Sequence, residues 1–460
     1  MKKTILTIAA AAFLLGFASC SKENEQPGPN GPVAAEGKET FMNLSITFPT
    51  EPGTKATGDP NATNKEAQIN RVDVFIYTGM GLFSSHKTLT LSDFSTNSPD
   101  GTADRYNAIT KIPTTTGTKL VFVGINLPQR IVDACKSKAA SEIASTVQTM
   151  SHDDLVGDLH DDFVMFSKKG YTSVFVEDQN AASNKIVAEC ERFVAKVTVE
   201  TSPTVDLTSL PGTLNNLVFT IDNYNTKFFL LQGAADEYRD PNWTLSSYVS
   251  TDFLRSSSIN HEYWAQVLRT ATLSDPANPT LSDWKATYAP ENTSFGKRKK
   301  EITRVNVRGE FIPAKITQYK SGSTTEFEVV DNSVNTAQTF WAITVSALEG
   351  TFFFYDLTTA YAFATAYGSG TQLPTTMYTN GECYWFIFLN KNPNNLINRW
   401  DVLRNDYYRC VITKISSLGR ATPDLGKGEE DDTPDVDTSI SVDVKIMFWH
   451  TPIKSEYILD

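Results

Sequence analysis

The feature that most constrains the fold is a strict alternation of apolar and polar residues near both ends of the chain. A period of two places every apolar side chain on one face of a strand, so each segment is predicted to be a β-strand with one buried face. The apolar positions are Met42, Leu44, Ile46 and Phe48 in the first segment and Ile440, Val442, Val444, Ile446 and Phe448 in the last.

Between these ends the chain holds many further runs rich in Val, Ile, Phe, Tyr and Thr, and clusters of Gly, Pro, Asn or Asp separate many of them. Only residues 130–155 have a more helical composition, and the spacing favours packed sheets over a parallel βαβ arrangement. We therefore expect a mostly all-β protein of two β-sandwich domains in tandem, with minor helical insertions. The expected domains are residues 38–205 and 206–460, and residues 233–300 are expected to add loops to the second.

The first twenty residues have the pattern of a bacterial export signal. Lys2 and Lys3 precede an apolar stretch over residues 5–17, and small residues lead directly to Cys20. The stretch is too short for a spanning helix and is typical of a cleaved signal. A cysteine in this place is typical of a lipobox, so Cys20 is expected to carry a lipid; an ordinary signal that ends in Cys is the alternative. Residues 21–37, rich in Pro, Gly, Asn and Glu, are expected to form a flexible tether.

Composition and motifs argue against several classes of function. The formal net charge of −12 disfavours a nucleic-acid partner. No Rossmann, P-loop or GxSxG motif occurs in the sequence, so we expect neither catalysis nor a cofactor. The one cluster of His and Asp, over residues 152–162, has neither EF-hand nor HExxH spacing, and it is interpreted as a polar loop and not as a metal site.

The four remaining cysteines are Cys135, Cys190, Cys383 and Cys410. They show no CxxC or other metal-ligand spacing. Two fall in each half of the chain, so a disulfide within each domain and free buried thiols are both open.

The turn-rich loop over residues 49–64 contains a candidate protease site. Lys55 is flanked by Gly53, Thr54 and Ala56, so a trypsin-like protease specific for Arg or Lys could cut between Lys55 and Ala56. Arg71 is the other basic candidate, but it opens a predicted strand over residues 71–77. A cut after Lys55 would release strand 42–48 and leave a groove with unpaired backbone groups and bare apolar surface.

The strand over residues 440–448 has the apolar face that such a groove requires. Burial of each apolar side chain contributes roughly 1.5–3 kcal/mol, and ladder hydrogen bonds add to this. Because insertion into a neighbour is head-to-tail, it would grow a filament instead of closing a dimer. The simpler alternative is that both terminal segments are edge strands of their own domains.

Several stretches together resemble the fimbrillins of the Bacteroidetes, most closely the minor-fimbria type. They are GFASCSKE at 16–23, GTKATG at 53–58, RFVAKVTV at 192–199, VLRNDYYRCVITKISSLG at 402–419 and VDVKIMFW at 442–449. In this family RFVAKVTV looks like the closing strand of the N-terminal domain.

The resemblance implies two transthyretin-like β-sandwich domains and a fimbrial subunit at the cell surface that supports adhesion. It further implies a precursor held in the outer membrane by its lipid and cut by an Arg- or Lys-specific protease. The C-terminal segment would then enter the groove of another fimbrial subunit, with anchor and tip proteins as further partners. The family's cut commonly follows Arg, whereas Lys55 stands at the matching position here. Shaft, tip and accessory positions stay open, as does the adhesion target.

A monomeric, surface-anchored lipoprotein that binds glycans or a host protein is the alternative function. Trp243, Trp264 and Trp284 lie in the region 233–300 and could form a platform for a saccharide, although such residues more often pack a core. This alternative predicts an uncut N-terminus.

Overall fold

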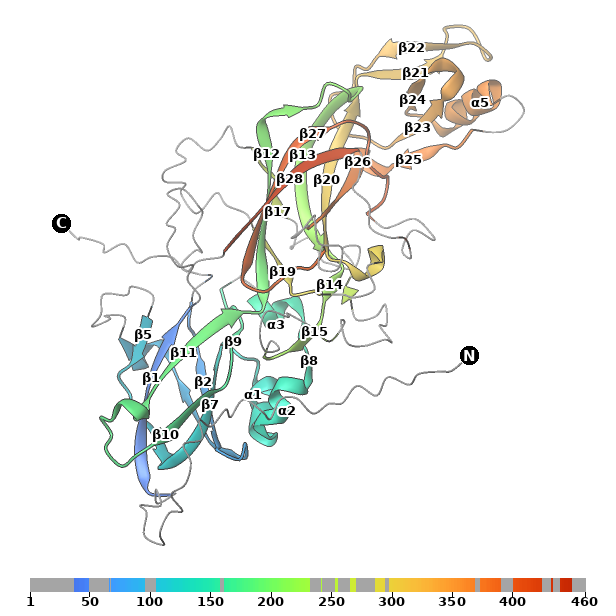
Figure 1. Cartoon of the computed structure of the whole chain (residues 1–460). Helices are drawn as coiled ribbons and strands as arrows, with labels where there is room; N and C mark the ends of the chain where they lie inside the picture. Colours follow the sequence, from blue (N-terminus) through green and yellow to red (C-terminus); the bar gives the residue numbers. More distant parts are fainter. Residues whose placement is uncertain are drawn as a thin grey trace, which may run out of the picture.

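The computed structural model describes residues 37–48, 66, 68–95, 105–157, 161–231, 241, 253–254, 265–269, 286–293, 298–368, 373–389, 400–423, 432 and 439–448. Figure 1 shows an elongated molecule with a first lobe at one end, a second lobe in the middle and a small outer lobe at the other end. No helix among the described residues is long and apolar enough to cross a membrane.

The first lobe is built mainly from the N-terminal part of the chain. Its strands are β1 (Glu39–Thr47), β2 (Val72–Thr78), β3 (Phe83–Leu89), β4 (Phe94–Ser95), β5 (Arg105–Ala108), β6 (Ile112–Thr115), β7 (Gly117–Ile125), β8 (Val147–Thr149), β9 (Met165–Ser167), β10 (Tyr171–Phe175) and β11 (Lys185–Arg192). Its helices are α1 (Gln129–Ser137), α2 (Ala140–Ser145) and α3 (His152–Val156). All three helices fall within the stretch 130–155 to within one residue, where the sequence had indicated helix.

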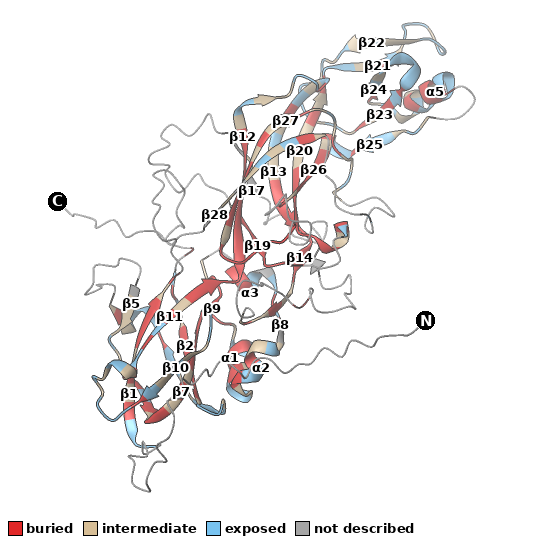
Figure 2. Cartoon of the chain, in the orientation of Figure 1, coloured by how far each residue is buried: buried red, intermediate tan, exposed pale blue. Residues whose placement is uncertain are grey.

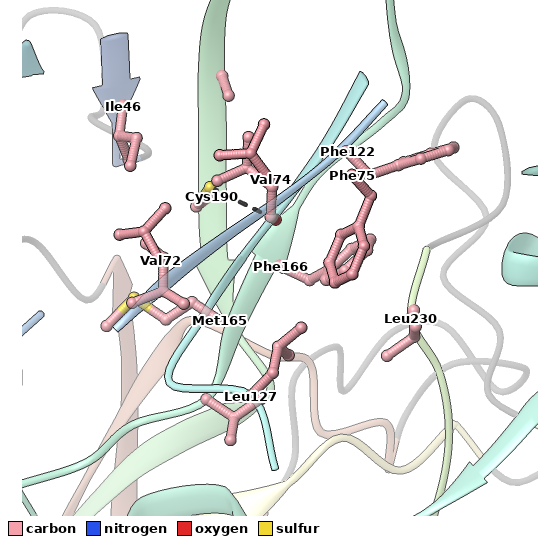
Figure 3. Packing of buried hydrophobic residues seen from close by; sticks show 14 of the residues in the cluster. Ile46, Val72, Val74, Phe75, Phe122, Leu127, Met165, Phe166, Cys190 and Leu230 are labelled. Carbon is pink, nitrogen blue, oxygen red and sulfur yellow. Dashed lines mark hydrogen bonds between the residues drawn. The ribbon is translucent and has the colours of Figure 1, made fainter. Parts of the chain in front are cut away.

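Apart from β8, the strands of the first lobe form one sheet in the order β3-β2-β7-β9-β11-β1-β5-β4, with β10 added on β7 and β6 on β1. Figure 3 shows the core that this sheet encloses, with Ile46 of β1 in the same cluster as Val72 and Val74 of β2 and Cys190 of β11. Helix α1 contributes its buried residues to this cluster and packs against β2 and β3.

The second lobe is a sandwich of two sheets. Its strands are β12 (Val194–Asp206), β13 (Gly212–Asp222), β14 (Tyr224–Asn225), β15 (Lys227–Phe229), β16 (Phe253–Leu254), β17 (Ala265–Gln266), β18 (Leu268–Arg269), β19 (Thr287–Pro290), β20 (Arg304–Pro313), β26 (Glu382–Phe388), β27 (Asp406–Ile415) and β28 (Ile440–Phe448). One sheet has the order β18-β12-β27-β28, with β19 on β12, and the other has the order β17-β13-β20-β26. Strands β14 and β16 pair with each other outside these two sheets. Buried residues along β12, β13 and β20 fill the space between the sheets (Figure 2). The expected mostly-β fold is confirmed.

Strand β12 is not where we expected it. The stretch 192–199 was expected to close the first domain, but β12 pairs in parallel with β27 and antiparallel with β19, both in the second lobe. Within β12, Val194 belongs to the first core and Ala195 to the second, so the second core begins ahead of the expected boundary at 205/206. A strongly apolar strand reveals its period but not the partner that it pairs with, which for β12 lies about two hundred residues downstream.

The two large lobes are also interleaved after β12. Strand β15 pairs with β8 of the first lobe, in the register Lys227↔Thr149 to Phe229↔Val147. Phe228 and Leu230 are buried in the first core. A single cut of the chain therefore does not separate the two cores.

The outer lobe was not predicted. It consists of β21 (Lys315–Tyr319), β22 (Phe327–Asp331), β23 (Phe340–Val345), β24 (Gly350–Phe354), α5 (Leu357–Tyr367) and β25 (Thr376–Tyr378). These elements are inserted between β20 and β26, which still pair directly from Arg304↔Phe388 to Glu310↔Glu382. Phe340 and Phe353 join the outer lobe to Phe311 of β20, with ring centroids 5.9 and 5.7 Å from it.

Candidate strand-exchange sites

Strand β1, the segment predicted to be displaced, lies inside its sheet. It pairs in parallel with β11 on one side, with Leu44 opposite Ile186. On the other side it pairs antiparallel with β6 along its first half and with β5 along its second half. The alternative that this segment is an edge strand is therefore wrong for β1, and its removal would open a gap with a strand on each side.

The apolar face of β1 is part of the first core. Met42, Leu44, Ile46 and Phe48 are 0, 1, 0 and 4% exposed. The ring of Phe48 meets the ring of Tyr106 edge-on at 5.9 Å between centroids. All four predicted side chains thus fill positions that would be bare without β1.

Side-chain hydrogen bonds also connect β1 to the segments beside it. Asn184, which is fully buried, donates from Nδ2 to Thr40 Oγ1 and to the carbonyl of Phe41, both at 3.2 Å. Ser45 Oγ donates to Asn107 Oδ1 at 2.6 Å. Asn184 would keep the carbonyls of Val176 and Asp178 as acceptors if β1 were lost. The backbone groups of β11, β5 and β6 that pair with β1 would lose their partners, and because buried unpaired backbone groups are costly, the gap favours refilling by another strand. Sequence reasoning missed Asn184 and Asn107, because nothing in the pattern around a single Asn indicates which strand it will bind.

The segment that follows β1 is described only at its ends. Lys55 and Ala56, the predicted cleavage residues, lie outside the described residues, as does the predicted lipid-bearing Cys20. Phe48 at one end and Glu66 at the other are both buried, at 4 and 1% exposed. The segment predicted to be cut is therefore fixed at both ends in the folded chain.

Strand β28, the predicted donor, is bound to its own lobe. It pairs antiparallel with β27 from Ile440↔Ile415 to Phe448↔Asp406, and it ends the order of its sheet among the described residues. Ile440 is 3% exposed, while Val442, Val444 and Ile446 are partly buried against the second core. The Phe448 side chain lies outside the description. The edge-strand alternative therefore does hold for β28.

The two candidate strands do not meet within one chain. Strand β1 lies in the first lobe and β28 in the second, in separate sheets (Figure 1). An exchange between them would therefore require a second molecule.

The His and Asp cluster at 152–162 has local structural roles where it is described. Asp154 accepts a hydrogen bond from the backbone of Ser151 at the start of α3 and binds Arg130 through both carboxylate oxygens, at 2.7 and 2.8 Å. Although partial burial raises it, these hydrogen bonds hold the pKa of Asp154 below its usual range. Asp158 and His160 lie outside the described residues, and within the described part of the chain no group of His, Cys, Asp and Glu is placed to hold a metal.

The sequence allowed either disulfides or free thiols at Cys135, Cys190, Cys383 and Cys410. All four are free thiols, and all are buried. Burial, followed by the charge of Asp73, raises the pKa of Cys135 to about 12, so this thiol is protonated at neutral pH. The tryptophans of the alternative saccharide platform, Trp243, Trp264 and Trp284, lie outside the described residues.

Two models of known protein families match this chain, one over a segment that includes most of β1 and the other over a segment that includes β28. The family model "Major fimbrial subunit protein (FimA)" matches residues 42–213, beginning inside β1. The model "Major fimbrial subunit protein type IV, Fimbrillin, C-terminal" matches residues 376–453, which include β28. The chain is a member of the fimbrillin family.

Individual relatives resemble this fimbrillin over most of its length. Minor fimbrium subunit Mfa1 of Porphyromonas gingivalis is 21% identical over 462 residues, covering 91% of this chain and 87% of the relative. The crystal structure of a protein assigned to cell adhesion from Parabacteroides distasonis matches with a TM-score of 0.50 at 14% identity, covering 90% of this fimbrillin and 100% of that chain. This structural likeness shows a shared fold. Neither family model reaches residues 214–375, which include the whole of the outer lobe except β25 and the few residues beside it.

Proposed function

We propose that this fimbrillin is a structural subunit of an adhesive fimbria at the cell surface, and that it polymerises when the C-terminal strand of one subunit replaces β1 of the next. The observation that carries the proposal is the position of β1 inside its sheet. An apolar strand joined to the rest of its lobe through a segment with a protease site can be removed, and its removal leaves a gap with a strand on each side. This role is structural and requires no catalytic group or cofactor.

The proposed sequence of events begins at the outer membrane, where the lipid on Cys20 holds the precursor. A trypsin-like protease specific for Arg or Lys cuts between Lys55 and Ala56, and β1 leaves together with the lipid. Strand β28 of a neighbouring subunit then enters between β11 and the β5–β6 side. Anchor and tip subunits would join by the same exchange, and surface receptors of host or bacterial cells are the partners of the finished fibre.

Pairing supports the direction of this exchange. In the isolated chain β28 has a strand partner on one side, β27, among the described residues. In the gap left by β1 it would have partners on both sides, and its apolar face would enter positions that Met42, Leu44, Ile46 and Phe48 now fill completely. A second ladder of hydrogen bonds and fuller burial both favour the exchanged state, against the entropy lost on association.

Deletion of residues 440–460 tests the proposal in cells. We expect the truncated chain to be secreted and cut but not to enter detergent-resistant polymers. A finer pair of variants is Val444→Asp, which places a charge in the apolar face, and Asp443→Ala, which changes an exposed side chain next to it. Val444→Asp should block polymerisation and Asp443→Ala should not. Normal polymerisation of the truncated chain would refute the proposal, and an uncut monomer would favour the lipid-anchored binding protein instead.

A further inference from the structure

Glu66 is the described residue closest to the proposed cleavage site on its C-terminal side, and it is buried at 1% exposed. Its carboxylate oxygens lie 2.9 and 3.0 Å from Nζ of Lys196. The hydroxyl of Tyr288 donates a hydrogen bond to Oε1 at 2.5 Å. Both side-chain oxygens of Glu66 are therefore bound inside the protein.

The backbone of Glu66 is held as well. Arg192 Nε donates to its carbonyl oxygen at 3.1 Å, while Nη1 of the same guanidinium donates to Asn405 Oδ1 at 3.0 Å. Burial, the main cause, lowers the pKa of Arg192 to about 10, so the guanidinium is still charged at neutral pH. Main chain and side chain of Glu66 are thus fixed by separate cations.

These partners come from the junction of the two large lobes. Arg192 ends β11, Lys196 lies in β12 and Tyr288 lies in β19. The ring of Tyr288 meets the ring of Phe163 edge-on at 4.7 Å. Burial, followed by the Glu66 carboxylate, raises the pKa of Tyr288 well above its ordinary value, so the phenol keeps the proton that it donates. Glu66 therefore anchors the segment between β1 and β2 to both large lobes at once.

Three basic residues follow β1 before β2 begins: Lys55, Lys65 and Arg71. A protease binds several residues on both sides of the bond that it cuts, so a bond in folded structure must open locally first. Cutting after Lys65 would require Glu66 to leave the junction, and Lys196, itself 2% exposed, would lose its buried carboxylate partner. Cutting after Arg71 would require Val72 of β2 to open, and Val72 is fully buried.

Cleavage after Lys65 would also give a product with an unfavourable charge arrangement at its new N-terminus. Glu66 would become its first residue and would carry a charged α-amino group. That group would lie next to the buried cations Arg192 and Lys196, whose charge would oppose it.

We propose that Glu66 is a positioning residue for the processing reaction. It fixes the end of the removable segment and protects the Lys65–Glu66 bond, so that cleavage between β1 and β2 is confined to the bond after Lys55. This inference rests on the proposed function and adds the device that makes its cleavage site specific.

The experiment is limited digestion of the full-length precursor by a trypsin-like protease, with the new N-termini identified by mass spectrometry. Between β1 and β2, the wild type should give one early N-terminus, Ala56. Glu66→Ala should keep this product and add a second whose N-terminus is residue 66, formed at least about tenfold faster than in the wild type. Lys196→Met, which breaks the same anchor from the other side, should add the same product.

Two controls make the outcome specific. The double variant Lys65→Gln/Glu66→Ala should lose the product that begins at residue 66 and keep the one at Ala56. Glu326→Ala changes an exposed glutamate of the outer lobe, whose side chain is 65% exposed, and should leave the wild-type pattern unchanged. A misfolded variant would instead be cut at many buried basic residues, which would count against the anchor.

The result also separates this inference from the function on which it rests. If the wild type is cut at Ala56 and neither anchor variant adds a product at residue 66, the anchor is refuted and the proposed processing stands. If the wild type is not cut after Lys55 but the anchor variants still open the bond after Lys65, the anchor stands and the processing site is refuted.

Discussion

Among individual residues, the most informative are charged side chains buried at the junction between the two large lobes. Arg404 binds Glu291 through Nε at 2.9 Å and the carbonyl of Phe229 at 3.1 Å, and its guanidinium covers the ring of Phe193 at 4.3 Å. Buried ion pairs add little net stability, but they tolerate few alternative geometries. We infer that this junction fixes how one lobe sits on the other, as a subunit of a stiff fibre requires.

Glu191 at the same junction predicts a pH dependence of stability. It is 6% exposed and its carboxylate lies 3.9 Å from Arg404. Burial raises the pKa of Glu191 from its ordinary value of 4.5 to about 7, more than the charge of Arg404 lowers it. The folded protein therefore keeps a proton on Glu191 up to about pH 7, whereas the unfolded chain releases it near pH 4.5. Raising the pH through this window favours the unfolded chain.

Glu191→Gln removes this titration. Relative to the variant, the wild type should lose roughly 3 kcal/mol of unfolding free energy between pH 4.5 and 7, at 1.36 kcal/mol per pKa unit. Urea denaturation of both proteins across this range measures the difference. A difference that stays constant with pH would show that Glu191 does not titrate there.

Individual strands were largely predictable from the sequence, and their partners were not. The segments 42–48, 71–77 and 440–448 correspond to β1, β2 and β28. Their alternation or their run of β-branched and aromatic residues is a local property that the chain displays directly. The parallel pairing of β1 with β11 joins residues about 140 positions apart, and no local pattern encodes it.

Helix α5 shows why the outer lobe was missed. Its sequence, LTTAYAFATAY, has no charged residue and no clear polar face, so it lacks the periodicity that indicates a surface helix. Its start is set by Asp356, whose carboxylate accepts a hydrogen bond from the backbone of Thr359 at 2.6 Å. A single capping residue is too weak a signal to identify a helix.

Because the proposed assembly removes β1, a substitution in β1 should lower the stability of the precursor but not that of the fibre. Leu44→Ala deletes a side chain that is 1% exposed and should destabilise the precursor by about 2–5 kcal/mol. Fibres assembled from it should dissociate at the same temperature in detergent as wild-type fibres, because the residue has left with β1. Ile76→Ala in β2, fully buried and retained, should weaken both forms. Fibres weakened by Leu44→Ala would show that β1 stays in the assembly.

At the scale of the whole molecule, the separation of β1 and β28 determines the kind of assembly. The gap belongs to the first lobe and the donor to the second, so each subunit would offer one of each at different places (Figure 1). Head-to-tail contacts of this kind extend without closing. The outer lobe lies at the end of the molecule away from β1, so it is available for a role other than strand exchange.

The most direct test of this account is the binding of a synthetic peptide of residues 440–460 to two truncated chains, 56–439 and 38–439, measured by calorimetry. Both lack β28 and offer the free edge of β27, but only 56–439 lacks β1. The account predicts a binding event on 56–439 that 38–439 does not show, together with a higher unfolding temperature of the complex. Equal binding to both chains would mean that the peptide returns only to β27, and it would contradict the exchange of β1 for a neighbour's β28.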